Sequence, residues 1–144
     1  MSAPLVPGSP PDLEFVYFLN TAVDVYSFPP PQNFELYSEY FDLQDLKTEA
    51  NVGGLYFTGS SFANNGNPNA FIGTLDLGEL GTIVFLFSIP PNLPLNPETG
   101  FYIPYQTFYC RILQGSGDFK FIQSGFVVIY TFPTGRYVYV YLDK

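Results

Sequence analysis

Short runs of β-forming residues, each ended by a cluster of glycine, proline or asparagine, limit the fold of this sequence most strongly. The runs consist mainly of Phe, Tyr, Val, Ile and Thr, which favour extended backbone. The chain holds 13 Gly and 14 Pro among its 144 residues, and most of them fall between the apolar runs, where turns occur in β proteins. The pattern predicts an all-β fold.

Eight or nine strands with short connections are expected. Extended segments are predicted over residues 13–20, 34–41, 55–62, 70–77, 82–89, 101–113, 118–122, 126–132 and 136–142. Residues 23–28 are expected to extend the first segment, and the polar stretch 42–51 is predicted as a short helix. Strands this short and regular favour an antiparallel meander closed into a barrel of about eight strands, because closure removes exposed edges.

The domain organisation is simple. Four prolines within residues 1–12 predict an extended, mobile N-terminal arm. Residues 13–144 form a single β-barrel domain, since a chain of this length suits one domain with a sizeable core. That core is expected to be aromatic, because the chain has 16 Phe and 12 Tyr but no Trp.

The charge balance argues against two classes of partner. Five basic and 13 acidic residues give a net charge of −8, which repels nucleic acid and anionic membrane surfaces. No apolar run reaches the roughly 18 residues needed to span a bilayer. The first residues also lack the basic and apolar regions of a secretory signal, so a cytoplasmic protein is expected.

The residue inventory excludes several kinds of active site. The chain has no His and one Cys, which excludes a His-based triad, a typical zinc site and an internal disulfide. No phosphate-binding or dinucleotide-binding motif is present. We therefore expect neither a metal nor a cofactor, and chemistry carried by Tyr, Asp, Glu, Arg and Asn.

Two polar residues within apolar strands are candidate catalytic groups. Asn20 ends the first strand, where its amide could hydrogen-bond a substrate carbonyl or simply begin a turn. Arg111 interrupts an apolar strand. It could hold a carboxylate inside the barrel, or it could face solvent or pair structurally with a glutamate.

Two glutamates complete the candidate catalytic set. Glu35 and Glu39 share one strand face with Tyr37. If that face is interior, burial would make them the best acid or base candidates. The alternative is a solvated outer face.

Aromatic residues are expected to line a ligand-binding lumen, because their rings stack on flat apolar molecules. The candidate lining residues are Tyr17, Phe18, Tyr37, Tyr56, Tyr105, Tyr109 and Cys110. Cys110 and Arg111 alternate, so only one of them faces the lumen, and Cys110 is expected to be a small core residue. Tyr137, Tyr139 and Tyr141 share a face that is either lumen wall or an oligomer interface.

The last third of the chain resembles a known family. Residues 107–113 lead into Gly115-Ser116-Gly117-Asp118-Phe119, followed by Gly125-Phe126-Val127, a Pro133-Thr134-Gly135 turn and a Tyr-rich final strand. This order resembles the allene oxide cyclase and dirigent-type barrels, and residues 16–20 are similar to the first strand of the cyclases. The resemblance implies a calycin-like eight-stranded barrel with an aromatic lumen, no cofactor, and assembly as a homo-oligomer, a dimer or trimer.

One departure from the family changes the expected activity. The cyclases carry a functional Glu two residues before the matching Asn, and here that position is Phe18. Allene oxide cyclase activity itself is therefore not expected. The expected function is a cofactor-independent cyclase or isomerase that binds an apolar small molecule and enforces a reactive conformation. The alternative is a non-enzymatic ligand-binding or structural assembly barrel.

Overall fold

The computed structural model describes residues 10–19, 23–27, 34–62, 70–88, 106–122 and 124–143. For residues 23–27, 34–38, 59–62, 70 and 88 it describes the backbone alone. The strands are β1 (Leu13–Phe18), β2 (Val23–Ser27), β3 (Phe34–Asp45), β4 (Asn51–Phe62), β5 (Ala70–Asp76), β6 (Thr82–Ser88), β7 (Thr107–Gly115), β8 (Ser124–Phe132) and β9 (Gly135–Asp143). Within the described ranges, no helix is long and apolar enough to cross a membrane.

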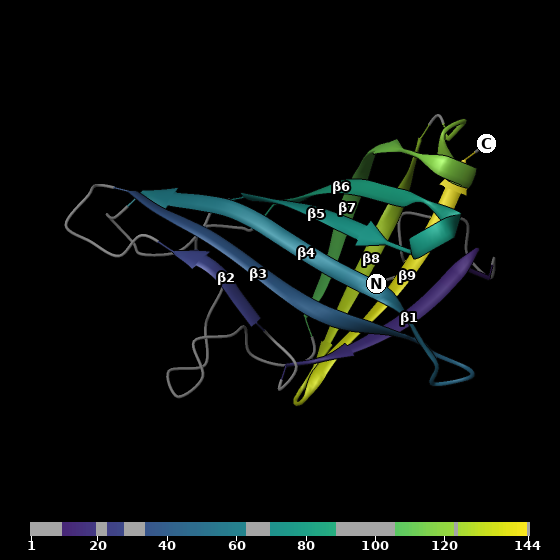
Figure 1. The fold of residues 1–144 in the computed structure, drawn as a ribbon, viewed down its shortest axis with the longest axis horizontal. Helices are drawn as coiled ribbons and strands as arrows, with labels where there is room; N and C mark the ends of the chain where they lie inside the picture. Colours follow the sequence, from purple (N-terminus) through teal and green to yellow (C-terminus); the bar gives the residue numbers. More distant parts are fainter. Residues whose placement is uncertain are drawn as a thin grey trace.

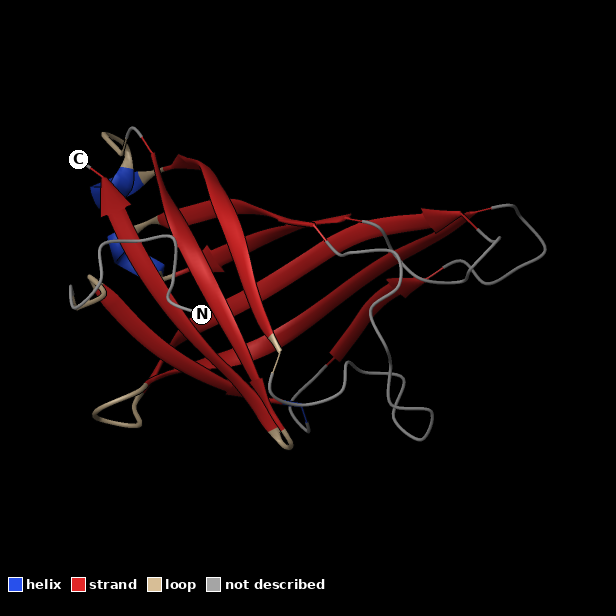
Figure 2. Cartoon of the chain, turned by 180° about the vertical axis from the view of Figure 1, so that it is seen from behind, coloured by secondary structure: helices blue, strands red, loops and turns tan. Residues whose placement is uncertain are grey.

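Eight of these strands form a closed antiparallel barrel, as the sequence predicted. Strands β3 to β9 pair in chain order, and β1 pairs with both β9 and β3 (Figure 1). Phe15 and Val16 lie opposite Asp45 and Gln44 and complete the ring. β2 pairs with the early part of β3 and lies outside the closed ring. Seen from behind, the described residues lie mostly in strands (Figure 2).

Alternating residues along each strand fill the barrel. On β7, Phe108, Cys110 and Ile112 are buried, whereas Arg111 and Leu113 are exposed. The same period of two continues around the ring, because successive strand residues point to opposite faces of a sheet. Other interior side chains are Phe41, Leu43, Leu55, Phe57, Phe71, Leu75, Ile83, Phe85, Val127, Ile129, Val138 and Val140.

The predicted helix over residues 42–51 is wrong. β3 continues to Asp45, and Leu43 extends its buried face. The chain then turns, and the Asp45 carboxylate accepts hydrogen bonds from the backbone N–H groups of Lys47 at 3.0 Å and Thr48 at 2.8 Å. A carboxylate that satisfies two backbone donors stabilises a tight turn, so the polar composition reflects a hairpin loop.

The strand predicted over residues 118–122 is also wrong. Residues Gly117–Phe119 form a 3-10 turn, η3, after Gly117 adopts a positive φ of 62°. This turn directs Phe119 into the core at one end of the barrel. A second 3-10 turn, η2 (Gly78–Leu80), lies beside it, so the two turns cover the same end.

The other boundaries differ modestly from the predictions. β2 is a separate strand rather than an extension of β1. Residues 1–9 of the predicted arm and residues 101–105 of the strand predicted over 101–113 lie outside the described residues. Asp12 already belongs to the barrel, because its N–H donates to the Val140 carbonyl at 2.8 Å and its carboxylate accepts from the Leu142 N–H at 2.7 Å.

Candidate functional site

A cluster of aromatic rings occupies the middle of the barrel. Five aromatic rings have their centroids within 6.5 Å of the Phe57 ring centroid. They belong to Tyr17, Phe41, Phe71, Phe85 and Phe87. Most of these pairs meet edge to face, the arrangement that aromatic rings prefer. Gly73 leaves room for the Phe85 ring, since a Cβ there would lie 2.3 Å from it.

Polar side chains gather on one side of this apolar interior. Tyr17, Glu39 and Arg136 are only 3%, 7% and 5% exposed. Tyr17 on β1 lies opposite Arg136 on β9, and Arg136 lies opposite the fully buried Thr131 on β8. Because all of them share the interior face of their strands, the fold brings an ionisable cluster to the barrel end near the β8–β9 hairpin.

Hydrogen bonds to the backbone hold Arg136 and Thr131 in place. Nη1 of Arg136 donates to the carbonyl oxygens of Gly135 at 2.8 Å and Phe132 at 3.2 Å. The Thr131 hydroxyl accepts a hydrogen bond from the Gln106 N–H at 2.7 Å. A guanidinium anchored on two carbonyls has little freedom to reorient, so its positive charge is fixed inside the barrel.

Burial keeps Tyr17 protonated. Burial raises the pKa of the Tyr17 phenol far above its usual value, the Arg136 charge opposes this rise, and Glu39 and Cys110 add to it. A phenol in this state donates or accepts a hydrogen bond but does not act as a base. The register places Arg136 opposite Tyr17, and Glu39 is two residues from Phe41, whose ring contacts Tyr17 at 4.5 Å.

Cys110 is an inert core residue, as the sequence predicted. Its side chain is fully buried, and burial raises the pKa of the thiol to about 12. The nucleophilic form of cysteine is the thiolate, and burial suppresses it here.

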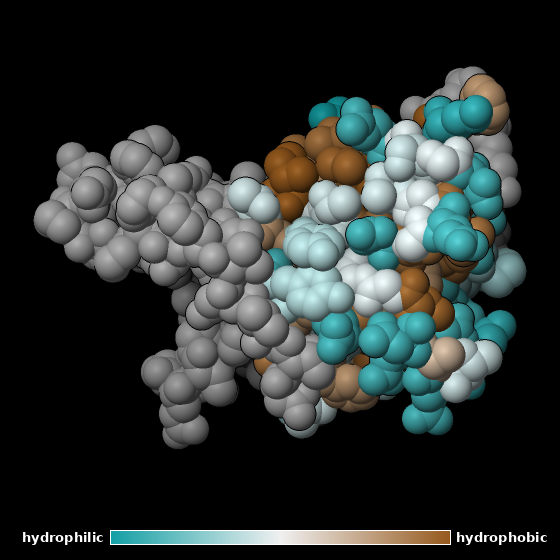
Figure 3. Space-filling view, in the orientation of Figure 1, coloured by the Kyte–Doolittle hydropathy of each residue, from teal (hydrophilic) through white to brown (hydrophobic). Residues whose placement is uncertain are grey.

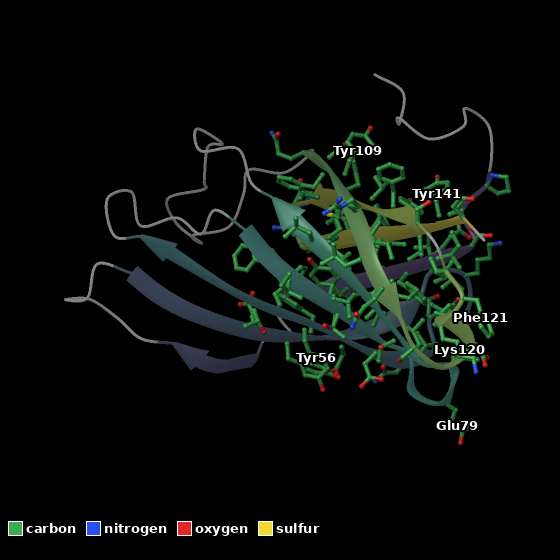
Figure 4. The ribbon with its side chains drawn as sticks, turned by 90° about the horizontal axis from the view of Figure 1, so that it is seen from above. Tyr56, Glu79, Tyr109, Lys120, Phe121 and Tyr141 are labelled. Carbon is green, nitrogen blue, oxygen red and sulfur yellow. The ribbon has the colours of Figure 1, made fainter. Side chains whose placement is uncertain are left out.

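The structure separates the predicted site residues into two groups. Tyr17, Glu39 and Cys110 point into the barrel. Arg111 is exposed on the outer face, and so is Tyr56 at 41%. Phe18 and Tyr109 are half-buried on that face as well. Figure 4 shows Tyr56 and Tyr109 projecting away from the barrel interior.

Four further predicted residues cannot be placed as side chains. Asn20 and Tyr105 lie outside the described residues. For Glu35 and Tyr37 the backbone is described, and it lies opposite Ser61 and Gly59 in the β3–β4 ladder.

Sequence reasoning missed Arg136 and Thr131. In β9, Arg136 shares its face with Val138 and Val140, which are fully buried. Because Arg136 alternates in phase with these valines, the sequence indicated that the three share a face. The tyrosines of the other face could equally have pointed into the barrel. Tyr137, Tyr139 and Tyr141 lie on the outer face and are half-buried, so they do not form lumen wall.

A separate pocket lies at the opposite end of the barrel. Its volume is about 390 Å³, and it is lined by Asp118, Phe119, Phe121, Ile122 and Leu142. Phe121 is 79% exposed, and the Lys120 ammonium lies 5.0 Å from the centre of its ring. Figure 4 shows both projecting from this end. The pocket opens to solvent and holds no buried polar group, so it is a weaker candidate than the interior cluster.

The surface of one face is mixed in character. Figure 3 shows hydrophilic and hydrophobic side chains interspersed over the described part of one face. In the ranges that the structure describes, no three Cys, Asp or Glu side chains gather closely enough to hold a metal ion.

Comparisons with protein families, with curated proteins and with solved structures give no match to this chain. The functional argument therefore rests on the interior cluster itself.

Proposed function

We propose that this barrel binds an apolar small molecule and, without a cofactor, holds it in a conformation from which it cyclises or isomerises. The ligand meets the ring cluster with its apolar part and Tyr17 with a polar group. The resemblance of residues 101–142 to the allene oxide cyclase and dirigent-type barrels supports the same kind of activity.

The observation that carries this proposal is the burial of Tyr17, Glu39 and Arg136 beside phenylalanine rings. Burying charge is costly and contributes little to stability, because desolvation offsets most of the attraction between opposite charges. Ionisable groups held in an apolar interior therefore favour a functional role. Most ligand sites combine these features, with apolar walls and a few polar groups that fix orientation.

The two arginines of the chain provide a matched test. We would measure binding of neutral polyenes and unsaturated ketones to the protein by saturation-transfer NMR and dialysis. Arg136→Gln should weaken binding about tenfold, because it removes the positive charge opposite Tyr17, the side chain that meets the polar group of the ligand. Arg111→Gln removes the same charge from the outer face and should leave binding unchanged.

The enzymatic part needs a separate readout. Cyclisation shortens a conjugated system, so turnover of a polyene lowers its ultraviolet absorbance. Loss of absorbance that depends on the protein and is slowed by Arg136→Gln would support a cyclase or isomerase. Equal effects of the two arginine variants, or no binding of any tested ligand, would contradict the proposal.

A structural role is the second candidate, and the filled ring cluster around Phe57 favours it. A further observation is a row of aromatic rings on the outer face of β8 and β9. The ring centroid of Tyr137 lies 6.4 Å from that of Tyr130, 4.6 Å from that of Phe132 and 6.3 Å from that of Tyr139. Aromatic side chains are enriched at protein interfaces. A homo-oligomer that binds no small molecule would fit this second role.

A further inference from the structure

Resting on the function proposed above, we propose that the substrate is an unsaturated ketone and that Glu39 and Tyr17 catalyse its enolisation. Glu39 takes a proton from carbon, and the Tyr17 hydroxyl binds the carbonyl oxygen. This names the substrate class and assigns a role to each group.

The Tyr17 hydroxyl is suited to donate a hydrogen bond to a carbonyl oxygen on which negative charge develops. Its ring is fixed by contacts to Phe41 and Phe57, at centroid distances of 4.5 and 6.5 Å. A fixed donor in an apolar, water-poor setting stabilises developing charge more than water does, because it needs no reorganisation. Because this phenol stays protonated, it remains a donor throughout the reaction.

Arg136 supports that donor as a positioning residue. It lies opposite Tyr17 across the β1–β9 pair, and its charge favours negative charge at the hydroxyl. The same charge favours an enolate whose oxygen accepts a hydrogen bond from Tyr17. Backbone carbonyls of Phe132 and Gly135 hold the guanidinium there.

Glu39 supplies the base. It lies on β3 opposite Phe57 of β4 and is buried, and its charge also acts on Tyr17. A carboxylate beside apolar rings is the kind of base used for proton abstraction next to a carbonyl. Base and oxygen-binding donor thus come from different strands, β3 and β1.

The proton transfer balances without a further reactant. The Glu39 carboxylate takes the proton from the carbon between the carbonyl and the double bond of a β,γ-unsaturated ketone. The C–H electron pair forms the enolate, whose oxygen accepts a hydrogen bond from Tyr17. Glu39 then returns the proton to the γ-carbon, the double bond moves into conjugation, and no electron leaves the system.

Deuterium exchange tests this directly, using the β,γ-unsaturated isomer of cyclohexenone as the probe. We would incubate the probe with the full chain in D2O, follow deuterium incorporation by NMR and record binding by saturation transfer. Glu39→Gln should slow exchange at least tenfold. Tyr17→Phe keeps the ring contacts and should slow it about 100- to 1,000-fold, as loss of one oxyanion donor does.

Matched variants separate chemistry from folding. Glu79→Gln and Tyr56→Phe make the same changes at exposed positions and should exchange at the parent rate. Arg136→Lys should recover part of the exchange lost in Arg136→Gln, since it restores the charge. If Glu39→Gln fails to fold, the exchange rate of Tyr17→Phe tests the enolisation role.

The outcomes distinguish the two proposals. If the probe binds but exchanges no faster than in buffer, or if Tyr17→Phe exchanges at the parent rate, the enolisation role is wrong and ligand binding stands. If neither the probe nor any polyene binds, both proposals are wrong.

Discussion

Tyr17 and Arg136 are directly opposite each other in the β1–β9 pair, and both side chains are buried on the interior face of the barrel. β1 is the strand that closes the ring, so the position of this pair depends on closure itself. The β1–β9 pair therefore also places the Tyr17 hydroxyl and the Arg136 charge on the same interior face of the barrel.

Arg136→Gln should lower the free energy of unfolding by about 2–4 kcal/mol, because one buried and one partly buried carbonyl lose a charged donor. The carbonyls concerned belong to Phe132 and Gly135. Urea denaturation would measure this. Arg111→Gln, on the exposed face, should change stability by no more than about 0.5 kcal/mol; equal losses would show that Arg136 is not buried.

Gly73→Ala should destabilise the barrel by about 2–3 kcal/mol, as overpacking of a core does. The new Cβ would meet the fully buried Phe85 ring, which has no space to move into. Gly54→Ala provides the comparison, because its Cβ would meet the half-buried Tyr40 ring and not a fully buried one. Thermal unfolding should show the larger loss for Gly73→Ala.

Stability should fall as the pH rises above 9. The Cys110 thiol of the unfolded chain loses its proton around 9.0, whereas the folded thiol keeps it to about 12. Burial of the neutral thiol therefore stabilises the fold fully below pH 9 and less as the pH approaches 12. Cys110 alone should contribute a loss of about 2 kcal/mol between about pH 8 and about pH 10.5.

Cys110→Ala should remove this part of the pH dependence. Tyr17, whose phenol is also held neutral by burial, should continue to contribute above pH 10. Urea midpoints at the two pH values measure both effects. An unchanged pH dependence in Cys110→Ala would contradict the burial of the thiol.

Ser116→Ala should cost about 1 kcal/mol, the usual contribution of a hydrogen bond. The Ser116 hydroxyl accepts from the Thr82 N–H at 3.1 Å and lies 2.7 Å from the Thr82 hydroxyl, which joins η3 to β6. Ser124→Ala removes a single exposed bond to Asp143 and should cost less. Similar losses in thermal unfolding would show that the Ser116 contact does not hold this end of the barrel.

The fold could be predicted from the sequence because most strands have a clear period of two and short connections. β7 shows this well, since Phe108, Cys110 and Ile112 alternate with more polar neighbours. The errors came from local chemistry. The polar stretch after Phe41 continues β3 to Asp45 and only then turns, with the Asp45 side chain stabilising the turn. Gly117 has a positive φ and begins a 3-10 turn where a strand was predicted.

The site was harder to predict than the fold. In β9 both faces are apolar or aromatic, so the sequence does not indicate whether the face that carries Arg136 points into the barrel or away from it. Arg111 had a visible signal for the outer face, because its neighbours Cys110 and Ile112 match the apolar alternation. The meeting of Tyr17, Glu39 and Arg136 depends on ring closure, which brings β1 beside both β9 and β3, and no local pattern encodes that.

Mapping a bound ligand on the protein tests the central claim most directly. We would titrate the isotope-labelled protein with a neutral unsaturated ketone and follow backbone amide shifts by NMR. Ligand binding in the interior predicts the largest shifts around Tyr17, Glu39 and Arg136, with those around Phe121 and Leu142 unchanged. Shifts confined to the pocket beside Phe121, or no shifts at all, would contradict the account.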